Sequence, residues 1–271
     1  MCLESLASAK VLTLPCSHAH HAQCVGKLRE FGIKQVCPLC RADLPPGPEQ
    51  LFDDAMRRYM VLYRRYNQGI VDNTPWRIRS VEDRGYAGKM VHMLEEAADQ
   101  GYAQAQCTLG HLYSNGHGVA QDYSAAMKWY RMAADQENAQ AQYNLGVMYY
   151  RGQGVAQDNS AAMKWYQMAA DQEHAQAQYN LGVMYYEGQG VAQDYSAAMK
   201  WYRMAADQGG AQAQWSLGFM YYLGHGVAQD YSVAMKWFRM AADQGLAQAQ
   251  GSLGTMYENG QGVAQDYSAA M

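Results

Sequence analysis

Long apolar runs are missing from the sequence: no eighteen consecutive apolar residues occur, so we expect no membrane span. Positive charge is not concentrated either. Residues 1–96 carry 13 Lys and Arg against 11 Asp and Glu, and residues 97–271 carry 8 against 14. The chain therefore lacks the basic face that phosphate backbones require, and we expect no nucleic-acid partner.

Cysteine is scarce outside the amino-terminal segment. Five of the six cysteines lie in the first forty of the 271 residues, together with three histidines. A disulfide framework would leave the histidines unexplained, whereas reduced thiols paired with a metal suit the cytosol or the nucleus. The cysteines are therefore interpreted as metal ligands.

The spacing of these residues is typical of zinc ligands. Cys16, His18, His21 and Cys24 form a Cys-x-His-x-x-His-x-x-Cys cluster, and Cys-Pro-Leu-Cys follows after twelve residues. Zinc prefers four Cys or His ligands in a tetrahedron, and closely spaced pairs are how short segments supply them. His20, next to this series, is expected to be a surface or packing residue.

The arrangement resembles the RING finger in its two-histidine variant, in which four pairs of ligands bind two zinc ions crosswise. The resemblance implies one complete site, made by Cys16, His18, Cys37 and Cys40. It implies three ligands of the other site: Cys2, His21 and Cys24. The eighth ligand would fall three residues before Cys2, so we expect a sequence cut short at this end.

The same resemblance implies a role. RING fingers have closed zinc sites without catalytic water, and they dock a ubiquitin-conjugating enzyme that carries ubiquitin as a thioester. The positions that would contact this enzyme are Met1, Leu28, Pro38 and Arg41. Leu28 stands where the family often has Trp, and Arg41 follows the final ligand, where active members often place a cation.

From about residue 86 the chain repeats itself. The motif Ala-Gln-Ala-Gln recurs with a period of 36, starting at Ala103, Ala139, Ala175, Ala211 and Ala247. A strict period in the thirties indicates stacked supersecondary units and not one closed domain. No unit contains a nucleophile with a base, a paired carboxylate site or a phosphate loop, so no catalytic residue is assigned.

Each unit is predicted to be a pair of antiparallel helices. Apolar residues with helical spacing mark the first helix (Ala141, Leu145, Met148 and Tyr149) and the second (Ala162, Trp165, Tyr166 and Ala169). Gly146 recurs within the first helix, which predicts a contact too close for a side chain. Gly152 should end this helix, and the carboxylate of Asp158 should cap the next one.

These units resemble the Sel1-like repeat, a relative of the tetratricopeptide fold, over residues 101–271. The signature is Ala-Gln-x-x-Leu-Gly-x-Met-Tyr, then Gly-x-Gly-Val-x-Gln-Asp-Tyr, then Ala-x-x-Trp-Tyr-x-x-Ala-Ala. Members of this family are generally adaptors that hold partners on an extended surface. The stripes of Met127, Trp129 and Tyr130 are expected to be core, and the last unit is expected to be cut short.

Two positions differ between otherwise similar copies. The residue after Ala-Gln-Ala-Gln is Cys107, Tyr143, Tyr179, Trp215 or Gly251. The residue before the glycine turn is Asn115, Arg151, Glu187, Leu223 or Asn259. We expect a packing or groove role for the first series, with Cys107 not catalytic, and drift on a solvent-facing position for the second.

The expected fold is mainly α: an α/α solenoid of 36-residue helix pairs, preceded by a small cross-brace zinc module. Residues 1–44 form the module, residues 45–85 a Pro-rich linker with a helix from Glu49 to about Tyr66, and residues 86–271 the solenoid. The expected function is a ubiquitin ligase that recruits a substrate or scaffold protein through the solenoid. The alternative is a zinc-stabilised adaptor without ligase activity. Either would work in the cytoplasm or nucleus, or at the surface of the endoplasmic reticulum.

Overall fold

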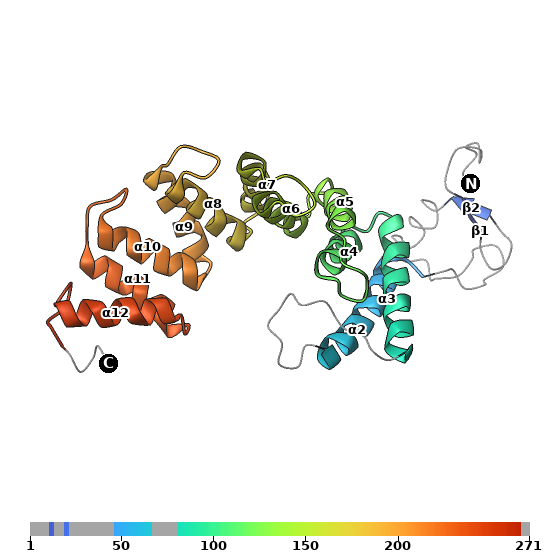
Figure 1. Cartoon of the computed structure of the whole chain (residues 1–271), viewed down its shortest axis with the longest axis horizontal. Helices are drawn as coiled ribbons and strands as arrows, with labels where there is room; N and C mark the ends of the chain where they lie inside the picture. Colours follow the sequence, from blue (N-terminus) through green and yellow to red (C-terminus); the bar gives the residue numbers. More distant parts are fainter. Residues whose placement is uncertain (1–10, 14–18, 22–45, 67–80, 267–271) are drawn as a thin grey trace. The chain divides into compact units, whose positions relative to one another are not determined.

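A computed structural model describes residues 11–13, 19–21, 46–66 and 81–266 of the chain (Figure 1). Near the amino terminus, strands β1 (Val11–Thr13) and β2 (Ala19–His21) pair antiparallel, with Val11 opposite His21. All other regular structure in these ranges is helical, as predicted. None of these helices is both long enough and apolar enough to cross a bilayer.

The chain divides into two compact units, residues 1–133 and 134–271. The helices that begin in the first unit are α2 (Pro48–Tyr66), α3 (Val81–Asp99), α4 (Ala103–Asn115) and α5 (Tyr123–Ala134). The helices of the second are α6 (Ala139–Arg151), α7 (Asn159–Asp171), α8 (Ala175–Glu187), α9 (Tyr195–Asp207), α10 (Ala211–Leu223), α11 (Tyr231–Asp243) and α12 (Ala247–Asn259).

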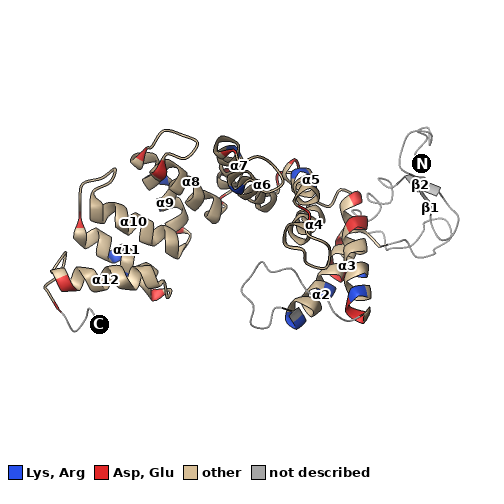
Figure 2. Ribbon diagram, in the orientation of Figure 1, with Lys and Arg blue, Asp and Glu red and all other residues tan. Residues whose placement is uncertain are grey.

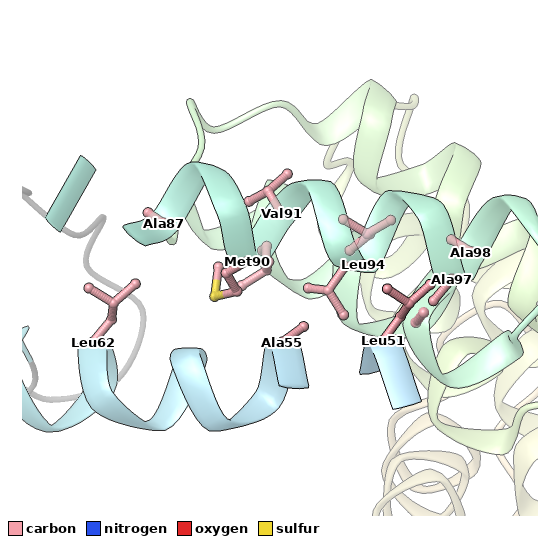
Figure 3. Close-up of a cluster of buried hydrophobic side chains, with 12 residues drawn as sticks. Leu51, Ala55, Leu62, Ala87, Met90, Val91, Leu94, Ala97 and Ala98 are labelled. Atoms are coloured by element: carbon pink, nitrogen blue, oxygen red, sulfur yellow. The ribbon is translucent and has the colours of Figure 1, made fainter. Parts of the chain in front are cut away.

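In the first unit, α2 packs along α3. Leu51, Ala55 and Leu62 of α2 are buried against a row on α3 that includes Met90 and Leu94 (Figure 3). The predicted helix from Glu49 to about Tyr66 is confirmed. Arg65 of α2 also forms an ion pair with Asp83 of α3, a residue that is only 8% exposed. The helix ahead of the first repeat therefore shares a core with it.

Each of the four repeats between residues 103 and 246 is a pair of helices, and the two helices pack closely where the first one carries a glycine. A Cβ placed on Gly182 of α8 would lie 2.5 Å from the ring of Tyr202 on α9. The equivalent glycines at 110, 146 and 218 meet Tyr130, Tyr166 and Phe238 at 2.5–2.8 Å. The prediction of a close contact at this glycine is confirmed at these four positions, and the partner is an aromatic ring.

The ends of the helices are capped as the sequence predicts. Gly152 ends α6 with φ 66°, a left-handed conformation that glycine adopts without a Cβ penalty. The Asp158 carboxylate accepts a hydrogen bond of 2.9 Å from the amide of Ala161 at the start of α7. Asp194 and Asp230 cap α9 and α11 in the same way.

A buried glutamine connects three consecutive helices in each of the repeats over residues 139–174, 175–210 and 211–246, which we call the inner repeats. Gln178 of α8 is 1% exposed, and its Nε2 donates to the carbonyl of Ala170 at the end of α7, 3.2 Å away. Its Oε1 accepts from Nε2 of Gln208, which follows α9, at 2.8 Å. Gln142 and Gln214 make the equivalent pairs with Gln172 and Gln244. Because both the Nε2 donor and the Oε1 acceptor of the buried glutamine are hydrogen-bonded, this side chain fixes the position of one repeat relative to the next.

Replacing Gly182 by Ala should destabilise the second unit. The new methyl group would overlap the ring of Tyr202, and overpacking of this kind costs about 1–3 kcal/mol. Alanine has the better helix propensity by about 1 kcal/mol, so we expect a net loss of up to about 2 kcal/mol in the free energy of unfolding, measured by chemical denaturation. Gly251→Ala is the matched control, because nothing lies within 4 Å of its Cβ position, and it should be neutral or stabilising. Equal effects of the two substitutions would contradict the packing role.

Candidate protein-binding surface and zinc module

Aromatic residues form a row on the first helices of the inner repeats. This aromatic row consists of Tyr143 on α6, Tyr179 on α8 and Trp215 on α10, all half-buried. The Tyr143 ring stacks on that of His174 with centroids 4.8 Å apart. Trp215 stacks on Phe219 at 5.3 Å, and its Nε1 donates to Oγ of Ser252 in the next repeat at 3.0 Å. The expected packing role is confirmed, although part of each ring remains exposed.

Polar amides accompany the aromatic row. Gln140 Nε2 donates to Asn144 Oδ1 at 3.2 Å, and the Gln176–Asn180 pair one repeat later has a distance of 3.4 Å. Gln140 also lies 3.2 Å from Nε2 of His174 through its side-chain oxygen. Half-buried aromatic rings beside hydrogen-bonding amides are typical of protein-binding surfaces.

The first and last residues of this series, Cys107 and Gly251, are not aromatic. Cys107 is 7% exposed, and burial raises the pKa of its thiol to about 12. The thiol therefore stays protonated at neutral pH, which agrees with the expectation that it is not a nucleophile. Gly251 has no side chain, and its Cβ position is open.

The residues before the glycine turn follow the solvent-facing expectation with one exception. Arg151, Glu187 and Asn259 are exposed, and Leu223 is 39% exposed. Asn115 is only 9% exposed, so the expectation is wrong there. Its Nδ2 donates to the carbonyl of His111 at 3.0 Å, which folds the side chain back onto α4.

A second row of side chains was not predicted from the sequence. Arg203 of α9 donates to the hydroxyl of Tyr221 at 3.4 Å, and its guanidinium lies 5.0 Å from the ring centroid of Trp237. Arg239 donates to the hydroxyl of Tyr257 at 2.9 Å. The only signal in the sequence was arginine at the same place in three copies, with Gln167 in the fourth.

The zinc module lies almost entirely outside the described residues. Of its predicted ligands only His21 belongs to a described element, at the end of β2. The others fall in segments that are not described: Cys2, Cys16, His18, Cys24, Cys37 and Cys40. The same is true of Met1, Leu28, Pro38 and Arg41. Among the residues that are described, no group of three or more His, Cys, Asp or Glu could hold a metal ion. The donor set itself, five thiols and two imidazoles, fits zinc.

His174 should make the second unit less stable in mild acid. Its Nδ1 accepts from the Ala177 amide at 3.3 Å, and burial lowers the pKa of the ring. The stabilisation is therefore complete above the unfolded pKa of about 6.5 and is lost as pH falls below that value. His174→Asn should keep the cap, because Asn138 caps α6 in this way, at 2.9 Å.

We expect denaturation of the His174→Asn variant to change less between pH 7.5 and 5 than that of the parent. The difference should be about 1 kcal/mol, the usual contribution of a cap. Identical pH dependence in the two proteins would show that His174 does not act as the titrating cap.

Two known families match separate parts of the chain. The Sel1 repeat family matches residues 103–138, 139–174, 175–210, 211–246 and 247–271. The Ring finger domain family matches residues 1–41, a match that implies zinc binding. The RING-H2 finger protein ATL34 of Arabidopsis thaliana is 42% identical over 50 residues, which is 18% of this chain and 15% of the relative. The likeness to that protein covers the RING segment alone.

Two solved structures share the helical part. A protective antigen of uropathogenic Escherichia coli, c5321, with an SLR fold, is 37% identical with a TM-score of 0.68. The match covers 83% of this chain and 47% of the antigen. A Sel1 repeat protein from Oxalobacter formigenes is 36% identical with a TM-score of 0.65, over 70% of this chain and 77% of its own. The chain belongs to the Sel1 repeat family and carries a RING zinc finger ahead of its repeats.

Proposed function

We propose that this protein is a RING-type ubiquitin ligase whose repeats recruit the substrate or a scaffold protein. One observation carries the proposal: a RING segment with zinc-ligand spacing is joined to a repeat solenoid in one chain. RING fingers transfer ubiquitin by holding the loaded conjugating enzyme beside a substrate, so a second, protein-binding part is what such a ligase needs. Ubiquitin would pass directly to the substrate lysine without a covalent intermediate on this chain.

The zinc segment would dock the conjugating enzyme. Met1, Leu28 and Pro38 would supply apolar contacts, and Arg41 would donate hydrogen bonds to the enzyme and to ubiquitin. Two zinc ions would brace the intact module, with Cys16, His18, Cys37 and Cys40 around one ion and Cys2, His21 and Cys24 at the other. Closed tetrahedral sites stabilise loops and supply no chemistry of their own.

The aromatic row would bind the substrate or scaffold. Tyr143 and Tyr179 are partly exposed, and they present large rigid side chains beside the amides of Asn144 and Asn180. Such side chains provide contact area with little loss of conformational entropy. The chemistry of the row favours a polypeptide partner that offers both apolar groups and backbone amides.

The second candidate is a zinc-stabilised adaptor without ligase activity. Leu28 favours it, because leucine presents less contact surface than the tryptophan that the family often has there. Pro38 and Arg41 favour the ligase. In this alternative the zinc segment would still hold partner proteins, and only transfer of ubiquitin would be absent.

Arg41→Ala should lower ubiquitin transfer by roughly tenfold or more while leaving zinc content unchanged. A hydrogen bond to a charged group contributes about 1.5–3 kcal/mol, and Arg41 is not a zinc ligand. The measurement is autoubiquitination in vitro with a panel of conjugating enzymes, with Lys89→Ala on α3 as the matched loss of a cation. A parent chain that is inert with the whole panel would leave the adaptor as the function.

This chain should bind one zinc ion tightly and a second more weakly, because seven ligands complete only one tetrahedral set. Competition with a chelator should show two affinities. An extension by Cys-Ala ahead of Met1 supplies the eighth ligand and should make both ions tight, whereas a Ser-Ala extension should not. Cys40→Ser should abolish the tight site. Two ions of equal, high affinity in the unextended chain would contradict this ligand assignment.

A further inference from the structure

Helix α2 has apolar residues on two faces. One face packs on α3 through Leu51, Ala55 and Leu62 (Figure 3). The other face forms a stripe along the helix, which we call the outer stripe; it consists of Asp53, Met56, Arg57, Met60, Val61 and Arg64. Met60 is 45% exposed and Val61 is 37% exposed.

The outer stripe is a helical pattern in its own right. Its members follow at intervals of three, one, three, one and three residues, so all six lie on one side of α2. They line a shallow recess in which three large apolar side chains sit among charged ones. Apolar residues grouped on a solvent-facing side of a helix are typical of a surface that binds another protein.

The charges on α2 are ordered along its length. Glu49 lies in the first turn and Asp53 follows one turn later, whereas Arg64 and Arg65 lie in the last turn (Figure 2). Arg65 is paired with Asp83 of α3, and the guanidinium of Arg58 lies 4.6 Å from the ring centroid of Tyr86. Arg64 is therefore the basic residue that the carboxyl end of the helix contributes to the outer stripe.

The charges of the outer stripe are complementary to those of a second outer stripe that runs in the opposite direction. In an antiparallel pair of α2 helices, Asp53 of one copy meets the partner's Arg64 at one end, and the reciprocal pair forms at the other. In this register Met56 lies opposite the partner's Val61, and Met60 lies opposite the partner's Arg57 beside the two-fold axis. Arg57 also lies near the centre, but its charge is balanced within each helix by Asp54 at 3.0 Å.

We propose that a second copy of this chain docks on the outer stripe, with α2 packed antiparallel on α2 across a two-fold axis. A two-fold interface uses the same surface on both subunits, which requires the self-complementarity seen here. A second copy is chosen as the occupant because the antiparallel arrangement brings Asp53 and Arg64 together twice, once at each end of the outer stripe.

The expected association is weak. The outer stripe runs over eleven residues, about 16 Å of helix, so a helix pair alone buries less than the roughly 1,000 Å² of a stable interface. Interfaces at this end of the size range are typical of weak, transient encounters. The dimer therefore forms at high local concentration and dissociates on dilution.

Sedimentation of the full chain between about 1 and 300 μM tests the proposal. The mass should rise from 30.3 kDa toward twice that value over this range. Asp53→Arg and Arg64→Asp should each weaken association at least tenfold, because like charges then meet at both ends. The double variant restores opposite charges at both ends and should recover dimer formation. Lys89→Glu on α3 is the control for net charge and should have no effect.

Two results would overturn the proposal. A mass that stays at 30.3 kDa up to 300 μM would show that no second copy binds, so that another protein or another part of this chain covers the outer stripe. Failure of the double variant to recover association would exclude the antiparallel pairing. Thermal unfolding followed by circular dichroism identifies any variant that has lost its helices. Met60→Glu, a substitution at an exposed position that reverses no charge, then replaces that variant and should weaken association to the same extent.

Discussion

The contact between an aromatic ring and a bare stretch of helix backbone is the constraint on which the repeats depend. Tyr166, Tyr202 and Phe238 each lie over a glycine of the preceding helix, where a methyl group would overlap the ring. This contact sets the distance between the two helices of a repeat. A glycine inside a helix costs about 1 kcal/mol, so it is retained where the packing that it permits gives more than it costs. The ring is large and almost fully buried, which meets that condition.

The contact between repeats depends on a second glycine. Gly226 has φ 72°, and a Cβ there would lie 2.9 Å from the carbonyl of Tyr195 in the preceding repeat. The turn of one repeat therefore rests directly on the start of the second helix of the repeat before it. The buried amide of Gln214 joins the same neighbours at their other end through Ala206 and Gln244. Because these two contacts fix the backbones of neighbouring repeats, the repeats differ mainly in the side chains that they expose. The residues of the aromatic row are among those that differ.

The sequence predicts most of the repeat fold, because its features are local. Period, helix spacing, the turn at Gly152 and the cap at Asp158 all act within a few residues of each other, and all were predictable. The buried role of Gln178 was not, since its two partners lie in different helices and a recurring polar residue also fits a solvent-facing position. Asn115 was misjudged for the same reason: its burial depends on a bond back to His111 that residue type does not reveal. The zinc ligand set stays a prediction that rests on residue type and spacing, because all of its members except His21 lie outside the described part of the chain.

The zinc segment and the repeats are stabilised by different interactions, and the difference matters for the proposed ligase. A segment of about forty residues is too small to bury an adequate core, so bound metal has to supply much of its folding free energy. The repeats stabilise each other by burying apolar faces against neighbours, and α2 joins them through its packing on α3. Only three residues lie between residue 44 and the start of α2, a tether of about 10 Å at full extension. A conjugating enzyme held by the zinc segment would therefore stay within a short reach of α2 and of the helices against which α2 packs. Short tethers raise the effective concentration of the two bound proteins for each other, which is the condition that direct transfer of ubiquitin requires.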